Sequence, residues 1–184
     1  MAPTPYRRRI IKPIQGLLAR CRTAGVHVIY VQSIRDPDAL EFTVFGQKEF
    51  VLRNEWGSRI IEALAPRRGE AIVEKNSHDC FNNTRMEAVL AQKKLNPGDS
   101  HAIVVGLGLT NCVACAVTGF SVRNYRVVVP MDCTASMTRE DEIVAYQRFM
   151  QNGHDYNVTL SDSPMITMAA EEKAGERALS PVRS

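Results

Sequence analysis

Apolar and polar residues follow one another along the chain in segments whose periods predict alternating helices and strands. Residues 10–23 place apolar side chains at helical spacing and stop before Gly25, which predicts a helix ended by that glycine. Five apolar or β-branched runs have the length of strands: 27–33, 70–75, 101–108, 126–132 and 156–160. The remaining helices are expected at 57–66, 84–90, 111–124 and 138–149, with Thr84 and Thr138 at helix starts.

Strands that are apolar throughout and separated by helices are typical of a parallel sheet covered on both faces. We therefore predict a single three-layer α/β/α domain over residues 1–184, with a mostly parallel sheet. The charged tail from about residue 170 is expected to be loose.

The composition favours a single globular domain and argues against a nucleic-acid-binding, membrane-spanning or disulfide-rich protein. The chain has 184 residues, of which 45% are hydrophobic and 23% charged, enough for one sizeable core. A net charge of +3 is too small to indicate a nucleic-acid partner, and no apolar run approaches the ~20 residues of a membrane span. Five unevenly spaced cysteines argue against a disulfide framework and for a reduced, cytoplasmic protein.

The stretch GLGLTNCVACAV joins the apolar run 101–108 to a predicted helix and carries Cys112 at the junction. Chemistry in parallel sheets lies at such strand ends, and the positive end of a helix dipole stabilises a thiolate there. Gly106 and Gly108 allow a sharp turn that exposes backbone N–H groups to an oxyanion. Cysteine is also among the most buried residue types, so a packed-core role for Cys112 stays open.

A redox or zinc function of the Cys112–Cys115 pair is disfavoured. A structural zinc site needs four ligands, and the sequence has no second CxxC or Cys/His pair to supply them. Cys115 lies on the apolar side of the predicted helix and is expected to pack, as are three further cysteines, Cys21, Cys80 and Cys133.

Two blocks of sequence resemble the isochorismatase-like cysteine hydrolases. The first is GLGLTNCVACAVTGFSVRNYRVVVPMDCTAS, in which the matching residues are Gly106, Thr110, Cys112, Val113, Tyr125, Val127–Val129, Asp132 and Ala135. The second is VEKNSHDCFNNTRMEAVL, in which Lys75, Phe81 and Thr84 match. The resemblance covers residues 10–160 or so and implies a Rossmann-like, isochorismatase-type fold.

The resemblance also implies a site. Cys112 corresponds to the nucleophile and Lys75 to its cationic partner. The N–H groups of Cys112 and Gly108 correspond to the oxyanion hole, with a cis peptide bond expected at Leu107–Gly108. Phe81 and Trp56 are expected to line the substrate pocket, although aromatic residues there are also common core residues.

The family's catalytic aspartate has no counterpart at its expected position. In the family it ends a first, central strand before the first helix, whereas this chain enters that helix directly after MAPTPYRRR. We therefore expect the first central strand to be missing, which leaves 27–33 and 101–108 each without one neighbour. Other candidates for proton transfer are Asp36, Asp79 and Glu74, and His78 lies three residues after Lys75, within reach of the site.

No metal or other cofactor is expected. The nicotinamidase branch of the family has an Asp-x-His metal motif after its second strand, whereas the corresponding loop SIRDPDALEF holds no histidine. The sequence therefore predicts a metal-independent hydrolase of a small amide-like C–N substrate, through a covalent intermediate on Cys112, in a homo-oligomer. Two alternatives stay open: a catalytically silent protein acting by association, and isochorismatase-type vinyl ether hydrolysis.

Overall fold

The computed structural model describes residues 5–48, 50–151 and 157–168. Its strands are β1 (Ile29–Ser33), β2 (Ala71–Lys75), β3 (His101–Ile103), β4 (Gly106–Leu107), β5 (Arg126–Pro130), β6 (Thr134–Ala135) and β7 (Val158–Ser161). The helices are α1 (Pro5–Arg8), α2 (Ile11–Thr23), α3 (Leu40–Thr43), α4 (Met86–Gln92), α5 (Ala114–Ser121) and α6 (Arg139–Gln151). Short 3₁₀ turns are η1 (Trp56–Ser58), η2 (Glu62–Leu64), η4 (Met131–Cys133) and η5 (Ser163–Met165), and η3 (Leu109–Val113) is a π turn.

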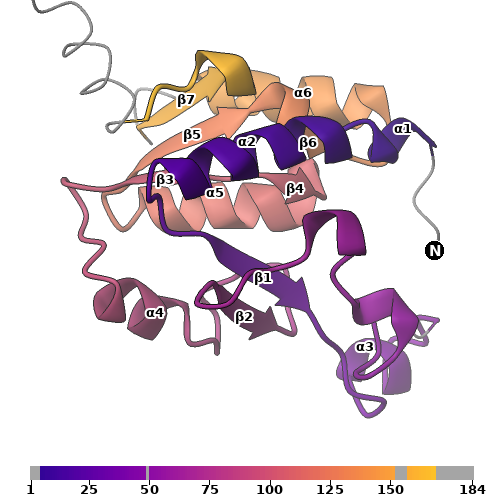
Figure 1. The fold of residues 1–184 in the computed structure, drawn as a ribbon. Coiled ribbons are helices and arrows are strands. Elements are labelled where there is room, and N and C mark those ends of the chain that lie inside the picture. Colours follow the sequence, from indigo (N-terminus) through magenta and orange to yellow (C-terminus); the bar gives the residue numbers. More distant parts are fainter. Residues whose placement is uncertain (1–4, 49, 152–156, 169–184) are drawn as a thin grey trace, which may run out of the picture.

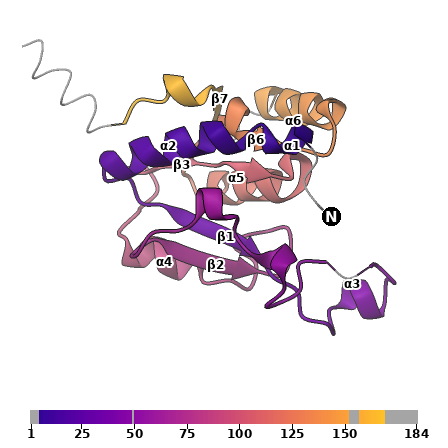
Figure 2. The same cartoon turned by 45° about the vertical axis from the view of Figure 1, so that its right-hand side comes forward.

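Every strand pairing is parallel, which confirms the predicted α/β class. The strands form three groups rather than one sheet: β1–β2, β3–β5–β7 and β4–β6. Within the described ranges, β1 has a strand partner only in β2, and β3 only in β5, so each keeps one open edge. Figures 1 and 2 show β1 and β2 as a separate pair below the other strands.

Helix α5 packs between the β1–β2 pair and the β3–β5–β7 group. The core around β5 includes Val127 and Val129, both fully buried, and the core around β2 includes Val73. Ala116 and Phe120 of α5 pack against both of these cores. The β1–β2 pair is therefore joined to β3–β5–β7 by side-chain packing on α5, not by backbone hydrogen bonds between strands.

The predicted helix at 57–66 is wrong, because only the turns η1 and η2 form there. Two carbonyl oxygens of this segment accept hydrogen bonds from side chains of other elements. Gln32 of β1 donates to the oxygen of Ser58 at 2.6 Å, and Gln15 of α2 donates to that of Ala63 at 2.9 Å. These bonds hold the segment in an irregular path along β1 and α2.

The predicted strand 101–108 is interrupted after β3, and Gly106 adopts a φ of 129° before β4. The other predicted helices and strands are confirmed with shifted ends, and the predicted loose tail lies outside the described residues. None of the described helices is long and apolar enough to cross a membrane.

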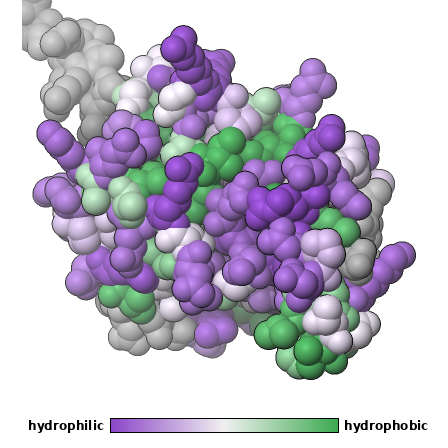
Figure 3. All heavy atoms as spheres, turned by 90° about the horizontal axis from the view of Figure 1, so that it is seen from below, coloured by the Kyte–Doolittle hydropathy of each residue, from purple (hydrophilic) through white to green (hydrophobic). Residues whose placement is uncertain are grey.

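A lobe between β1 and β2 projects from the body of the molecule and carries α3 (Figure 1). Arg35 ties its base by an ion pair with Glu41. Several of its apolar side chains are exposed and gather at the lower right of Figure 3, among them Leu40, Val44 and Phe45.

Candidate active site

Lys75 is the last residue of β2, and its side chain is buried at the carboxyl end of that strand. Its Nζ donates to the carbonyl oxygen of Ser77 at 2.6 Å, to that of His78 at 3.2 Å, and to the Sγ of Cys112 at 3.2 Å. An ammonium group has three N–H donors, so each donor of Lys75 has an acceptor. The structure thus brings the two predicted catalytic residues into direct contact.

Cys112 lies in the π turn η3, directly before α5, at the strand-to-helix junction that the sequence predicts. Gly108 starts this turn with φ 80° and ψ 52°, a left-handed conformation that glycine adopts without strain. A Cβ at Gly108 would lie 3.6 Å from the backbone nitrogen of Cys112 and 3.9 Å from its Sγ. A side chain at this position would therefore touch Cys112, and the positive φ disfavours any residue other than glycine.

A hydrogen-bonded chain supports the turn from behind. The N–H and hydroxyl of Thr110 lie 3.2 and 3.3 Å from the hydroxyl of Ser136. The N–H of Ser136 donates to buried Glu142, which also accepts from Arg9 and from the hydroxyl of Tyr6, each at 2.7 Å. The N-terminal helix and α6 thereby fix the start of the turn that carries Cys112.

His78 is the third side chain at the thiol. Its Nδ1 lies 3.4 Å from the Sγ of Cys112, and the side chain is exposed to solvent. Sequence reasoning placed His78 within reach but gave it no role, because spacing from Lys75 alone does not fix the direction of a loop side chain.

The carboxylates considered for proton transfer are all engaged elsewhere. Asp79 accepts from the N–H of Phe81 at 2.8 Å, and Asp36 and Glu74 both pair with Arg53. Across the described part of the chain, no carboxylate forms a hydrogen bond or ion pair with Lys75 or Cys112.

The predicted oxyanion hole needs a correction at Gly108. The Leu107–Gly108 bond is trans, since no cis peptide bond occurs in the described ranges. The N–H of Gly108 donates to the carbonyl oxygen of Ala135 at 2.8 Å, because β4 and β6 pair as parallel strands up to this residue. The Gly108 N–H is therefore occupied, and of the predicted donors only the N–H of Cys112 stays a candidate.

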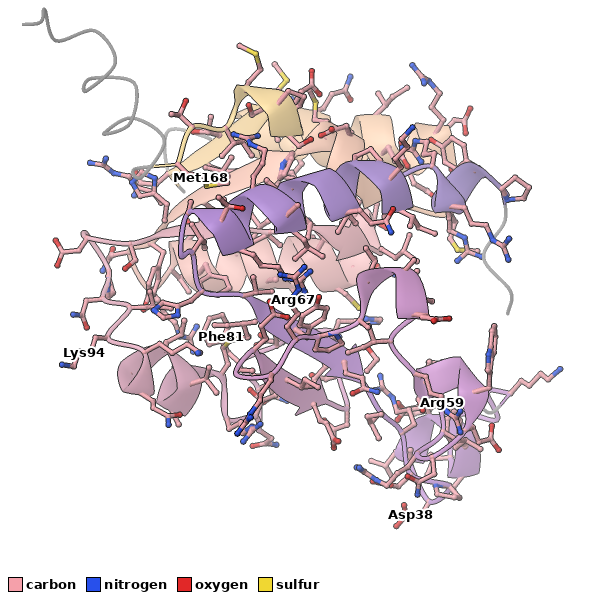
Figure 4. The ribbon with its side chains drawn as sticks, in the orientation of Figure 1. Asp38, Arg59, Arg67, Phe81, Lys94 and Met168 are labelled. Atoms are coloured by element: carbon pink, nitrogen blue, oxygen red, sulfur yellow. The ribbon has the colours of Figure 1, made fainter. Side chains whose placement is uncertain are left out.

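The two predicted aromatic lining residues lie in different environments, Phe81 in the core and Trp56 at the surface. Phe81 is 8% exposed and packs in the core with α4 and Phe120, with the guanidinium of Arg123 3.9 Å from its ring centroid. Trp56 is 73% exposed in η1. Figure 4 labels Phe81 beside α4, far from the projecting lobe that carries Asp38. A pocket-lining role for either residue stays a prediction.

Three of the other four thiols are unsuited to act as thiolates. Burial raises the pKa of Cys80 to about 11 and that of Cys133 to about 12, and it also raises the pKa of Cys115. The five cysteines, all within the described ranges, form no disulfide bonds with one another. A cavity of about 370 Å³ beside α5 is lined by Cys115 and Phe149 but not by Cys112, so it does not mark the space in front of the Cys112 sulfur.

The chain is similar to several characterised amidohydrolases. It is 25% identical to the ureidoacrylate amidohydrolase of Caulobacter segnis, over 57% of this chain and 50% of that protein. It is 26% identical to the N-carbamoylsarcosine amidase of an Arthrobacter species, over 70% of this chain and 50% of that protein. The chain thus spans about half the length of these two relatives.

Its fold is similar to that of the cysteine hydrolase of Pseudomonas syringae pv. phaseolicola, with a TM-score of 0.78 and 23% identity over 92% of this chain and 83% of that one. The Isochorismatase domain matches residues 3–161, most of the chain, including both Lys75 and Cys112. The protein belongs to the isochorismatase family.

Proposed function

We propose that the protein is a cysteine hydrolase that cleaves the C–N bond of a small amide-like substrate through a covalent intermediate on Cys112. The observation that carries this proposal is the contact of 3.2 Å between the Nζ of Lys75 and the Sγ of Cys112. A thiolate is the nucleophilic form of cysteine, and a fixed cation beside it favours that form.

The environment of Cys112 suits attack on a carbonyl carbon. The sulfur lies where a strand turns into a helix, so the helix dipole adds to the effect of Lys75. When the carbonyl carbon becomes tetrahedral, its oxygen gains negative charge, and the N–H of Cys112 is our candidate to stabilise it.

The names of the relatives favour amide hydrolysis over vinyl ether hydrolysis. A ureidoacrylate amidohydrolase and an N-carbamoylsarcosine amidase both act on a C–N bond next to a carbonyl group. We infer the same class of bond for this chain, and leave the substrate open within the class of small amides and carbamoyl compounds. No role for a metal is proposed: among the described residues, no three His, Cys, Asp or Glu side chains group as a metal site would need.

The test is turnover of a panel of small primary amides and N-carbamoyl amino acids by the wild type, Cys112→Ala, Lys75→Met and the control Cys115→Ala. We expect loss of all turnover in Cys112→Ala, a loss of about 10²-fold or more in Lys75→Met, and little change in the control. Mass spectrometry of the quenched wild type should show an acyl adduct on Cys112. Turnover that survives in Cys112→Ala would overturn the mechanism, and an inactive wild type would favour the silent alternative.

We further infer a cytoplasmic homo-oligomer that binds neither nucleic acid nor membranes. Five cysteines that are not joined in disulfide bonds support a reducing compartment. The exposed apolar side chains of the α3 lobe support association of copies. Sedimentation analysis across a range of concentrations checks the oligomer, and a monomer throughout would contradict it.

A further inference from the structure

All three N–H donors of the Lys75 ammonium have hydrogen-bond acceptors in the site. Two of its donors are held by the backbone oxygens of Ser77 and His78, and the third points to Cys112. A proton carried by Lys75 would have to leave one of these bonds, and a neutral amine would lose the charge that favours the thiolate. Lys75 is therefore suited to remain a fixed cation, and proton transfer requires another group.

The side chain of His78 lies where a proton-transfer group for Cys112 would be needed. Its Nδ1 is the one other side-chain atom of the described residues that lies within hydrogen-bond distance of the Cys112 sulfur, at 3.4 Å. An imidazole can accept a proton from a thiol and return it to a leaving group near neutral pH. His78 is an exposed residue, so solvent reaches the loop that carries it.

We propose that His78 is the catalytic acid and base of this site, paired with Cys112, while Lys75 supplies a constant positive charge. This inference rests on the proposed hydrolase function. It assigns to a histidine the proton transfer for which the described residues offer no carboxylate at the sulfur.

The proposed cycle balances as follows. Nδ1 of His78 takes the proton of the Cys112 thiol, and the thiolate forms a C–S bond to the substrate carbonyl carbon. The C–N bond then breaks as the imidazolium gives its proton to the leaving nitrogen, which leaves as a neutral amine or ammonia. A water molecule next gives one proton to His78 and forms a C–O bond, the C–S bond breaks, and a carboxylic acid leaves with the thiolate–imidazolium pair restored.

The backbone of His78 binds Lys75, whereas its side chain lies beside Cys112, so a side-chain substitution tests the proposal separately. Its carbonyl oxygen holds Lys75, so a side-chain substitution leaves that bond available. The charged groups around the imidazole are Lys75 of β2, Asp79 on the same loop and Glu41 of α3, whose carboxylate interacts electrostatically with His78. These groups stay unchanged in a variant of His78.

The substitution to make is His78→Asn, because its amide keeps a polar group near the position of Nδ1 but cannot carry a proton. The matched control is His101→Asn, an exposed histidine at the start of β3. The rate of iodoacetamide alkylation of Cys112 is measured from pH 5.5 to 9, with melting temperatures as a check on folding. The best amide of the panel is then assayed with and without added imidazole.

We expect His78→Asn to alkylate about tenfold more slowly than the wild type at pH 6.5 and to converge with it near pH 9, where hydroxide removes the thiol proton. Its amide turnover should fall by about 10²–10⁴-fold and recover in part with imidazole, while His101→Asn behaves as wild type. An alkylation profile that superimposes on the wild type would overturn the role of His78, whether or not any amide is hydrolysed. A shifted profile in a protein that hydrolyses no amide would support the Cys112–His78 pair and reject the hydrolase function.

Discussion

The ring of Phe81 packs directly over Gly119, so closely that a Cβ on this glycine would lie 2.6 and 2.9 Å from two ring carbons. Phe81 belongs to the loop that connects Lys75 and His78 to α4, and Gly119 belongs to α5, the helix that follows Cys112. The missing side chain of Gly119 therefore sets how near the loop of Lys75 and His78 can approach α5.

The substitution Gly119→Ala should destabilise the protein by about 1–3 kcal/mol, because the ring of Phe81 must move out of a packed core. Urea unfolding measures the change. The control is Gly16→Ala in α2, where a Cβ meets nothing within 4 Å and alanine should stabilise the helix by about 0.5–1 kcal/mol. Equal stability of the two variants would contradict the close packing.

Cys112 should be the first of the five thiols to react with limiting iodoacetamide at pH 8. Burial raises the pKa of Cys80 to about 11 and that of Cys133 to about 12, so few of these thiols are ionised at that pH. Peptide mapping by mass spectrometry identifies the labelled site. Faster labelling of Cys115 or Cys80 would show that the sulfur next to Lys75 is not the activated one.

The ion pair of Arg22 and Glu70 should contribute to stability in a pH-dependent way. The guanidinium of Arg22 donates to both carboxylate oxygens, at 2.7 and 2.9 Å, and lowers the pKa of Glu70. A lowered carboxyl pKa stabilises the fold above the unfolded value of about 4.3, and this contribution is lost as the pH falls through the folded value.

Glu70→Gln should therefore cost about 2 kcal/mol at pH 7, and the difference from wild type should shrink steadily below pH ~4. Melting temperatures from pH 3 to 8 measure this, with the exposed Glu62→Gln as the control. A difference that stays constant down to pH 3 would show that the charge of Glu70 does not stabilise the fold.

Chelators should leave the fold and any hydrolase activity unchanged. In the part of the chain that the structure describes, no cluster of three potential metal-ligating side chains occurs. The measurements are metal content of protein purified without added metal, and melting temperature and turnover after dialysis against EDTA. Stoichiometric zinc or iron would refute the prediction.

Much of the site's framework could be predicted from local sequence. The apolar run 101–108 and the helix after it place Cys112 at a strand-to-helix junction. The start of α6 is equally local: the hydroxyl of Thr138 accepts from the N–H of Asp141, whose carboxylate accepts in return from the N–H of Thr138. The contact of Lys75 with Cys112 needed the family resemblance, because no local pattern reports a distance between two strands.

Features set by tertiary contacts could not be predicted. The direction of His78 depends on a loop that packs through Phe81 against Gly119, a pair that is distant in sequence. The use of the Gly108 N–H depends on its pairing with Ala135 of β6, which periodicity does not reveal. The failed helix at 57–66 has the same origin, because side chains of β1 and α2 bind its carbonyl groups.

The division of the strands into separate groups has a consequence for reactivity. Lys75 ends β2 of the β1–β2 pair, whereas Cys112 lies in the turn that leads into α5. The contact between Lys75 and Cys112 therefore joins two parts of the molecule that share no strand pairing. A Coulomb interaction varies with the inverse of distance. A change in the distance between the Nζ of Lys75 and the Sγ of Cys112 therefore changes how strongly the cation favours the thiolate. The fraction of Cys112 present as thiolate therefore depends on how closely the β1–β2 pair packs against the turn that carries the sulfur.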